Sequence, residues 1–398
     1  MATKSPPRRP GGIPRGLADT GPVLFSYGFR PFFLGAGLWA VAAMALWVAT
    51  LAGLAEPGGA YGAANWHMHE MLFGFASAVL AGYLMTAVPN WTGRMPVSGP
   101  PLMALAALWL AGRLMLTFPL NALWLAVTVE ALFLPVMAAV FLREIVAGCK
   151  WRDLKIVGLV GLIALANIGF HAAVLGGGDP RTAARAAVAG FIALILIVGG
   201  RITPSFTRNW LARMKRAARP APADRFDELT IVVSLAALVL WVGWPENQVL
   251  MLAALAAAAL NLMRLLRWRG WHVAEPMVLA LHGGYLMVAL GFAAIAATAM
   301  GWMSHAAALH VLAIGAIGGE MLAVMTRASR SHTGADTDAD LTATLSFVAI
   351  MLATVARAAA DFAAYDALVM LSGLSWIAAF GLFTLGHARL LAATRRSR

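Results

Sequence analysis

The chain has 398 residues, of which 61% are hydrophobic and only 12% charged, and its net charge is +12. Since soluble domains carry roughly 25% charged residues, this composition excludes a soluble globular fold. The single cysteine, Cys149, excludes an internal disulfide and any cysteine-rich zinc or iron–sulfur site.

Twelve apolar stretches follow a Pro-, Gly- and Arg-rich arm, residues 1–30, which we expect to be disordered. A membrane-spanning helix needs about 20 apolar residues. Helices and closed barrels are the only backbones that span a bilayer, and barrel strands alternate in polarity. We therefore expect an all-α polytopic membrane protein with a single transmembrane domain over residues 31–390. The predicted spans are 31–54, 67–88, 101–118, 121–142, 154–175, 183–200, 229–244, 246–266, 276–298, 304–326, 341–357 and 366–388.

The positions of the basic residues predict the orientation of the chain. Cytoplasmic loops are enriched in Lys and Arg, and 26 of the 30 basic residues fall on one side when the N-terminus is cytoplasmic. Both termini should then be cytoplasmic, with the basic loop 201–228 along the cytoplasmic surface. The charge serves orientation and anionic lipid rather than nucleic acid. The exceptions are Arg113, Arg181, Arg185 and Arg357.

Histidines gather near the outer ends of three predicted spans. A bilayer cannot solvate such groups, so they are costly unless they bind something, and imidazole is a good ligand for iron, copper and zinc. A single one of them is readily explained as an interfacial or hydrogen-bonded histidine. Several at one depth favour a metal or haem site in a helix bundle. They are His67 and His69 at the start of span 2, His171 in span 5, and His305 and His310 in span 10.

Two carboxylates lie at or below the same depth. Glu70 is one turn from His67, so we expect it to accept the N–H of that ring or to carry protons. Glu130 is near the middle of span 4. It is interpreted either as half of a structural ion pair with Arg113 on span 3 or as part of a proton relay, and we favour the pair.

A second polar cluster lies on the cytoplasmic side. His282, Tyr285 and Glu320 are placed within spans 9 and 10. The basic residues around them are explained either by the rule that orients the chain or by binding of anionic propionates or a quinol head group. His282 and Glu320 are not covered by that rule, since neither belongs in lipid. The surrounding residues are Asn90, Arg94, Arg201, Arg327 and His332.

Motifs along nearly the whole chain resemble the NnrS family of bacterial inner-membrane proteins, which contain haem and copper and are linked to nitric oxide. Ser331 and Ala335 depart from the usual tail motif, and Glu320 stands where a small or apolar residue is more familiar. The matching strings are Phe29-Arg30-Pro31-Phe32-Phe33, Trp66-His67-Met68-His69-Glu70-Met71-Leu72-Phe73-Gly74, Ala87-Val88-Pro89-Asn90-Trp91-Thr92-Gly93-Arg94, Gly200-Arg201 with Pro204 and Phe206-Thr207, Leu281-His282 with Tyr285, His310 before Gly315-Ala316-Ile317-Gly318, and Thr326-Arg327-Ala328-Ser329 before His332-Thr333-Gly334.

The resemblance implies a multi-pass protein of the bacterial inner membrane that protects against nitric oxide (NO). It implies haem b as the cofactor and leaves copper open as a second metal. We expect reduction of NO to N2O, with electrons from quinol or a separate donor and with Glu70, Glu320 and Tyr285 in the proton path. The haem or metal ligands would come from His67, His69, His310, His171 and His282. The alternatives are a non-enzymatic haem- or metal-binding protein for NO sensing or metal handling and, less favoured, a secondary transporter.

Overall fold

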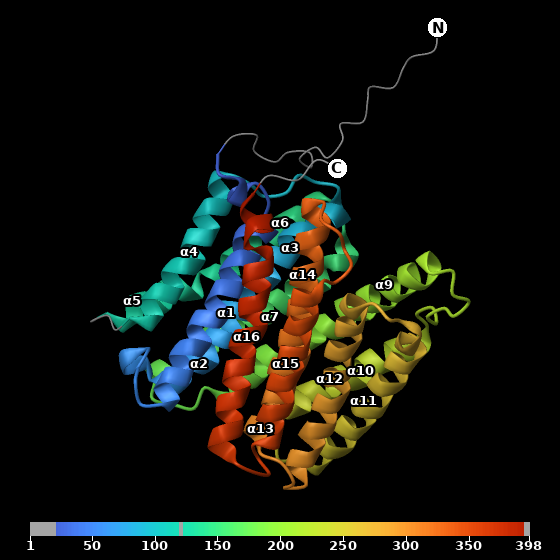
Figure 1. Cartoon of the computed structure of the whole chain (residues 1–398). Helices are drawn as coiled ribbons and strands as arrows, with labels where there is room; N and C mark the ends of the chain where they lie inside the picture. The colour runs from blue at the N-terminus through green and yellow to red at the C-terminus, as the bar shows by residue number, and fades with distance from the viewer. Residues whose placement is uncertain (1–20, 119–121, 394–398) are drawn as a thin grey trace.

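The computed structural model describes residues 21–118 and 122–393, and these ranges are helical without any strand. Twelve helices within them are long and apolar enough to cross a membrane (Figure 1), which confirms the predicted all-α polytopic architecture. The cytoplasmic placement of the termini stays a prediction. The spans are Phe29–Leu51, Ala63–Thr92, Pro100–Thr117, Leu123–Ala147, Trp151–Leu175, Arg181–Arg213, Arg225–Gly243, Gln248–His272, Pro276–Ala299, His305–Thr333, Leu341–Ala359 and Tyr365–Ala392.

Span 6 differs most from the sequence-based expectation. It does not end at residue 200 but continues through α9 (Gly200–Arg213), so residues 201–213 of the predicted loop 201–228 are helical. Thr203, Thr207 and Leu211 recur every four residues and are buried, while the basic residues of α9 face outward. The continuous apolar stretch ends where the charged residues begin. The helix continues as an amphipathic helix because one face still packs on the bundle.

Three of the spans form the most buried part of the bundle. Each contains a π-helical segment: η3 (Glu70–Ala76) between α2 (Ala63–His69) and α3 (Ser77–Thr92), η5 (Ile195–Gly199) between α8 (Arg181–Leu194) and α9, and η7 (Val311–Gly318) between α13 (His305–His310) and α14 (Gly319–Thr333). A π turn is rare and costs regular hydrogen bonding, and it is found frequently at functional sites. The three segments therefore mark where to look for a site.

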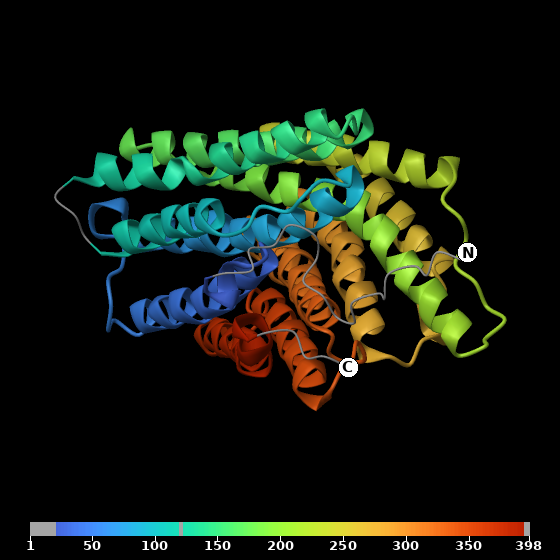
Figure 2. The same ribbon diagram turned by 90° about the horizontal axis from the view of Figure 1, so that it is seen from above.

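The first and last helices close the bundle. Helix α1 (Phe29–Leu51) lies beside α16 (Tyr365–Ala392), as Figures 1 and 2 show in blue and red. The buried Arg30 donates from one guanidinium nitrogen to the carbonyl oxygens of Leu390, Leu391 and Ala393, at 3.2, 2.7 and 2.8 Å. Carbonyls at a helix C-terminus lack partners within the helix, so Arg30 supplies the missing donor. Both ends of the described chain thus meet at one end of the bundle.

The predicted N-terminal arm is only partly covered. Residues 1–20 lie outside the described residues, but Tyr27, Phe29 and Arg30 are already buried in the bundle. The packed domain therefore begins before residue 31, because this aromatic and basic segment fits between α1, α16 and the end of α14.

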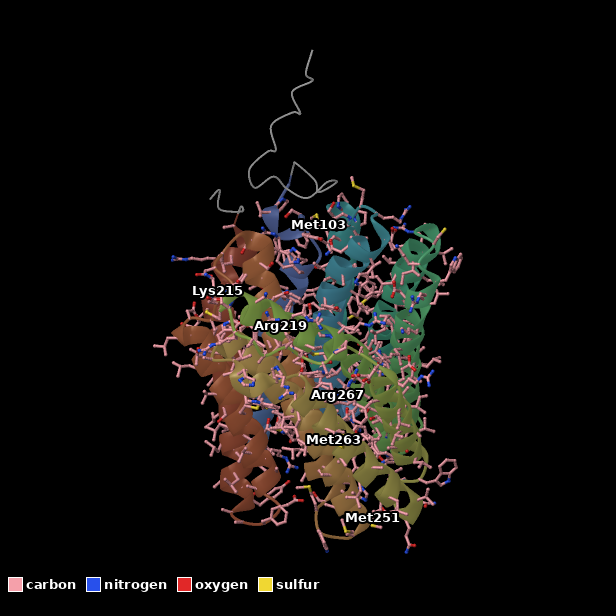
Figure 3. The ribbon with its side chains drawn as sticks, turned by 90° about the vertical axis from the view of Figure 1, so that its right-hand side faces the viewer. Met103, Lys215, Arg219, Met251, Met263 and Arg267 are labelled. Atoms are coloured by element: carbon pink, nitrogen blue, oxygen red, sulfur yellow. The ribbon has the colours of Figure 1, made fainter. Side chains whose placement is uncertain are left out.

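The segment after α9 is attached to helix α11 (Gln248–Arg267) by an ion pair. Arg267 approaches Asp224 at 2.5 Å and lowers the pKa of that carboxyl to about 2. Figure 3 shows Lys215 and Arg219 on the Arg267 side of α11, away from Met251 at its other end. The basic residues of this region thus gather at one end of the bundle, as the orientation argument expects.

Candidate functional site

A cavity of about 400 Å³ lies between the π-containing spans, at the end of the bundle away from the chain ends. Its walls come from α1, α2, η3, α8, the end of α10 (Arg225–Gly243), α13, η7, α16 and the end of α15 (Leu341–Ala359), and they are mostly apolar and aromatic. Ligand sites in proteins have volumes of roughly 300–1,000 Å³ and the same kind of lining, with a few polar groups that fix orientation. This cavity is therefore the first candidate for a site.

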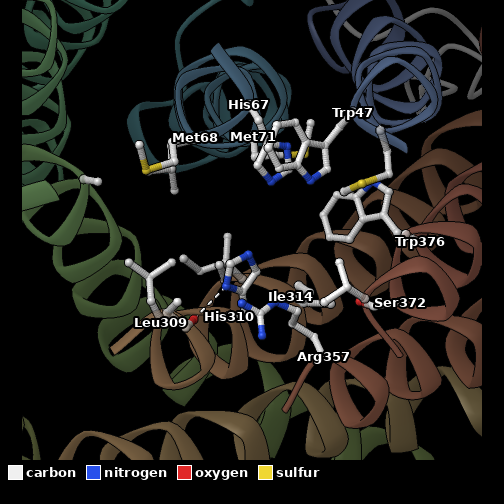
Figure 4. Close-up of a pocket in the computed structure, with 18 of the residues that line it drawn as sticks. Trp47, His67, Met68, Met71, Leu309, His310, Ile314, Arg357, Ser372 and Trp376 are labelled. Carbon is white, nitrogen blue, oxygen red and sulfur yellow. Dashed lines mark hydrogen bonds between the residues drawn. The ribbon is translucent and has the colours of Figure 1, made fainter. Parts of the chain in front are cut away.

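Three histidines line this cavity: His67 from α2 and His310 from α13 face it from opposite walls (Figure 4), and the exposed His305 pairs with Glu246 at 2.9 Å. Nδ1 of His310 lies 2.7 Å from the carbonyl oxygen of Ala306. A carbonyl can only accept, so Nδ1 carries the proton and Nε2 of the neutral ring keeps its lone pair. Histidines that bind metals usually donate their other N–H in this way. His310 is thus prepared to act as a ligand.

The ring of His67 is held differently. It stacks on the indole of Trp47, with the ring centroids 4.3 Å apart and the planes within 10°. Its Nδ1 is buried and has no hydrogen-bond partner among residues 21–118 and 122–393. Buried polar atoms without partners are uncommon and costly. The position of His67 is fixed by packing, which leaves its nitrogens available to a bound molecule.

Three arginines line the same cavity: Arg181, Arg185 and Arg357. Arg357 is only 7% exposed, and one of its terminal nitrogens is buried without a partner in the part of the chain that the structure describes. A buried guanidinium without a carboxylate is strongly unfavourable unless an anion binds to it. These are three of the four basic residues that break the side rule. Their position on the side opposite to most basic residues was visible in the sequence, although the sequence did not connect them to a site.

A second site lies on the opposite face of the helix that carries His67. Residues two apart on a helix are rotated by about 200°, so His69 points away from His67. Nδ1 of His69 lies 3.0 Å from an oxygen of Glu70, and Nε2 lies 3.0 Å from the side-chain oxygen of Asn167. His69, Glu70 and Asn167 are completely buried.

Arg113 joins two buried carboxylates in this second site. Its terminal nitrogens lie 2.9 Å from Glu70 and 2.6 Å from Glu130, so the expected pair of Glu130 with Arg113 is confirmed. The expectation that Glu70 accepts a hydrogen bond from His67 is wrong. Glu70 accepts instead from Arg113, His69 and the indole N–H of Trp39, because the guanidinium is the stronger partner for a buried charge.

His171 connects Glu130 to a tyrosine that the sequence analysis missed. Nε2 of His171 lies 2.7 Å from Glu130, and Nδ1 lies 2.8 Å from the hydroxyl of Tyr61. A carboxylate can only accept, so Nε2 of His171 carries a proton and Nδ1 accepts a hydrogen bond from the Tyr61 hydroxyl. This fixes the proton of His171 on Nε2, where it is donated to Glu130. Tyr61 lies in a turn between two spans, where hydropathy gives no signal.

The ligand atoms of His69, Glu130 and His171 all lie within 4.8 Å of one another. Two imidazoles and a carboxylate form a donor set that suits copper or zinc. Glu70 and Glu130 together carry one more charge than Arg113 balances, and a bound cation or a proton on His69 neutralises the difference. We call this group, with Asn167 and Tyr61, the carboxylate–histidine network.

Two of the predicted cytoplasmic-side residues, His282 and Tyr285, have hydrogen-bond partners of their own. On helix α12 (Pro276–Ala299), His282 lies 2.8 Å from the hydroxyl of Thr207, and the hydroxyl of Tyr285 lies between Arg264 and Asn261, at 2.8 and 2.7 Å. Neither His282 nor Tyr285 lines the large cavity.

The five residues predicted to surround them also differ in their contacts. Asn90, Arg94 and Arg201 are exposed, Arg327 and His332 are partly buried, and none of the five lines the large cavity. Asn90 is exposed and donates to the carbonyl of Thr86, Arg94 pairs with Glu144 at 2.5 Å, Arg201 is exposed, Arg327 lies over the ring of Phe206 at 3.9 Å, and His332 packs against Tyr27 and Phe29.

The family model described as NnrS protein matches residues 23–395, nearly the whole chain. No curated protein matches the chain at a significant level.

Proposed function

This chain belongs to the NnrS family of membrane proteins of nitric oxide metabolism, and from that premise we propose that it binds haem b between His67 and His310 and reduces NO to N2O. One observation carries the proposal. The same cavity holds a histidine whose other N–H is already donated to a carbonyl and a buried arginine nitrogen that has no partner among the described residues.

The residues that line the cavity fit a haem. Nε2 of His310 supplies a ligand for the iron. Arg357, with Arg185 and Arg181 nearer the surface, supplies donors for two anionic propionates. Trp47 and Trp376 supply flat apolar walls for a macrocycle. The volume and the predominance of apolar lining agree with a large and mostly apolar ligand.

The residues of this chain have separable tasks in the reaction. The haem, when bound, supplies an iron that binds NO and exchanges single electrons. His310 holds the cofactor, and Trp47 fixes the ring of His67 on the other wall, where the ring can hold a proton close to bound NO. The apolar walls admit NO from the lipid and exclude water. Two NO, two electrons and two protons give N2O and water, and the electrons come from a quinol or a separate donor.

The carboxylate–histidine network supports a second metal. His69, Glu130 and His171 would hold a copper ion in place of the protons now shared among them; the Tyr61 hydroxyl would then accept from Nδ1 of His171, and Asn167 would orient Glu130. Glu70 is then a partner of Arg113 and His69 rather than a proton donor to the cavity, because it does not line the cavity.

The test is haem content and NO consumption of purified protein supplied with a reductant. His310→Ala should lose the Soret band and NO consumption together. His282→Ala removes a buried histidine outside the cavity and should keep both, which makes it the matched control. A normal Soret band in His310→Ala would refute the assigned cavity. If the wild type binds haem but consumes no NO, the reductase proposal fails and a haem-binding sensor takes its place.

A further inference from the structure

A second, narrow crevice opens beside Glu320. Its walls come from α3, the end of α8, η5, α9 and the start of α14, and apart from Glu320 and Tyr83 they are apolar. Tyr83, Ile195 and Val198 are partly exposed although they lie within membrane spans. The crevice therefore opens sideways, toward the lipid rather than toward either aqueous face.

Glu320 is the unusual member of this crevice. Its side chain is 5% exposed, and Oε1 is buried without a partner among the described residues. Gly284 of α12 packs directly on it: a Cβ at residue 284 would lie 2.9 Å from Cγ of Glu320. The close approach of α12 fixes the carboxyl in place. An ionisable group inside the membrane without a partner is expensive and generally marks a functional site.

The crevice and the large cavity share their walls. On one continuous helix, Ala76 lines the cavity and Val79 lines the crevice. On another, Ile317 lines the cavity and Glu320 lines the crevice. Three residues of helix correspond to about 4.5 Å. The edges of the two spaces are thus separated by about one helical turn along two helices. A molecule in the crevice lies close enough to one in the cavity for electron transfer.

We propose that the crevice binds a membrane quinol, that Oε1 of Glu320 accepts a hydrogen bond from a quinol hydroxyl, and that the carboxyl passes its own proton on before it takes the proton of the quinol. The inference rests on the proposed function and names its electron donor. The observations select this ligand class: it enters from lipid, packs an apolar ring between helices, and offers a hydroxyl donor to an acceptor that has none.

The exchange of electrons and protons balances. Oxidation of one quinol to quinone breaks two O–H bonds and releases two electrons and two protons. The electrons pass to the large cavity, and the protons leave one after the other through Oε1 of Glu320. Reduction of two NO to N2O and water consumes the same number of each. The net reaction is one quinol and two NO giving one quinone, one N2O and one water.

The experiment compares two electron donors on the haem-loaded protein: a short-chain ubiquinol, and ascorbate with a soluble mediator that reduces the haem directly. Glu320→Gln should lower quinol-driven NO consumption by about a hundredfold, the lower end of what a positioned proton-transfer group contributes. Ascorbate-driven consumption and haem content should not change. Val198→Trp fills the crevice and should give the same pattern. Val239→Trp, at a position 66% exposed on helix α10 (Arg225–Gly243), is the matched control and should behave as wild type.

Two results would overturn the quinol site while leaving the proposed function intact. One is normal quinol-driven consumption in both Glu320→Gln and Val198→Trp. The other is an equal loss with both donors, which would make Glu320 structural. If the wild type consumes no NO with either donor, the proposed function fails instead. Equilibrium binding of short-chain ubiquinone then decides the site: it must weaken in Glu320→Gln and Val198→Trp but not in Val239→Trp.

Discussion

Replacing Arg113 by methionine should destabilise this protein strongly. Arg113 is 1% exposed and its two terminal nitrogens hold Glu70 and Glu130, at 2.9 and 2.6 Å. Methionine fills a similar volume but carries no charge and no donor. The variant therefore leaves two carboxylates in a buried site where one guanidinium had served both.

The magnitude depends on the number of pairs broken. Removing one partner of a buried ion pair costs about 3–5 kcal/mol, because the other charge stays buried without compensation. Arg113 serves two carboxylates, so we expect about 5 kcal/mol or more. One kcal/mol shifts Tm by about 2–4 °C in domains of 150–250 residues and by less in a longer chain. A fall in Tm on the order of 5–10 °C is expected.

Thermal unfolding of the purified protein in detergent provides the assay, with Arg113→Met compared to the double variant Arg113→Met/Glu70→Gln. The double variant removes one carboxylate together with the guanidinium and so returns the net charge of the site to its native value. It should recover part of the lost Tm. An Arg113→Met protein as stable as wild type, or a double variant no more stable than the single one, would refute the charge argument.

Three further predictions concern other parts of the molecule. Gly74→Ala should lower Tm, because its Cβ would overlap Arg113 and Glu70, whereas Gly158→Ala, with open space around it, should be neutral or slightly stabilising; similar Tm values for the two would contradict this packing. His171→Ala should lose bound copper, measured by elemental analysis, but keep the Soret band, because the network is separate from the cavity. Loss of both copper and haem would show that the two sites depend on each other. A reporter that works only in the cytoplasm should be active when it is fused to the C-terminus, because the positions of the basic residues place this terminus in the cytoplasm. Activity of a reporter that works only in the periplasm would contradict the predicted orientation.

The spans were predictable because lipid imposes a length and a polarity on each helix. The pair of Glu130 with Arg113 was predictable for a related reason, since two opposite charges at similar depth on neighbouring spans have few other partners. The same argument could not choose the partner of Glu70. That choice depends on the rotation of each helix, which hydropathy does not encode.

The separation of the histidines into two sites was harder to foresee. Depth placed His67, His69, His171 and His310 together, but depth does not say which way a helix faces. His67 and His310 reach the cavity, while His69 and His171 turn to Glu130. His67 and His69 face opposite sides of one helix because they lie two residues apart, but which side meets the cavity depends on how the neighbouring spans pack, and no pattern of residue types in the chain indicates that packing.

The contact of Arg30 with the end of α16 has a consequence for assembly in the cell. Arg30 is made early, but the carbonyls that satisfy it belong to residues 390, 391 and 393 of a 398-residue chain. Domains form during synthesis as their segments emerge, so the Arg30 guanidinium lacks these acceptors until the last helix is inserted. Deletion of only the final turn of α16 would leave the Arg30 guanidinium buried near the start of the chain without its acceptors. Quality control should therefore detect a truncation at one terminus as a defect at the other.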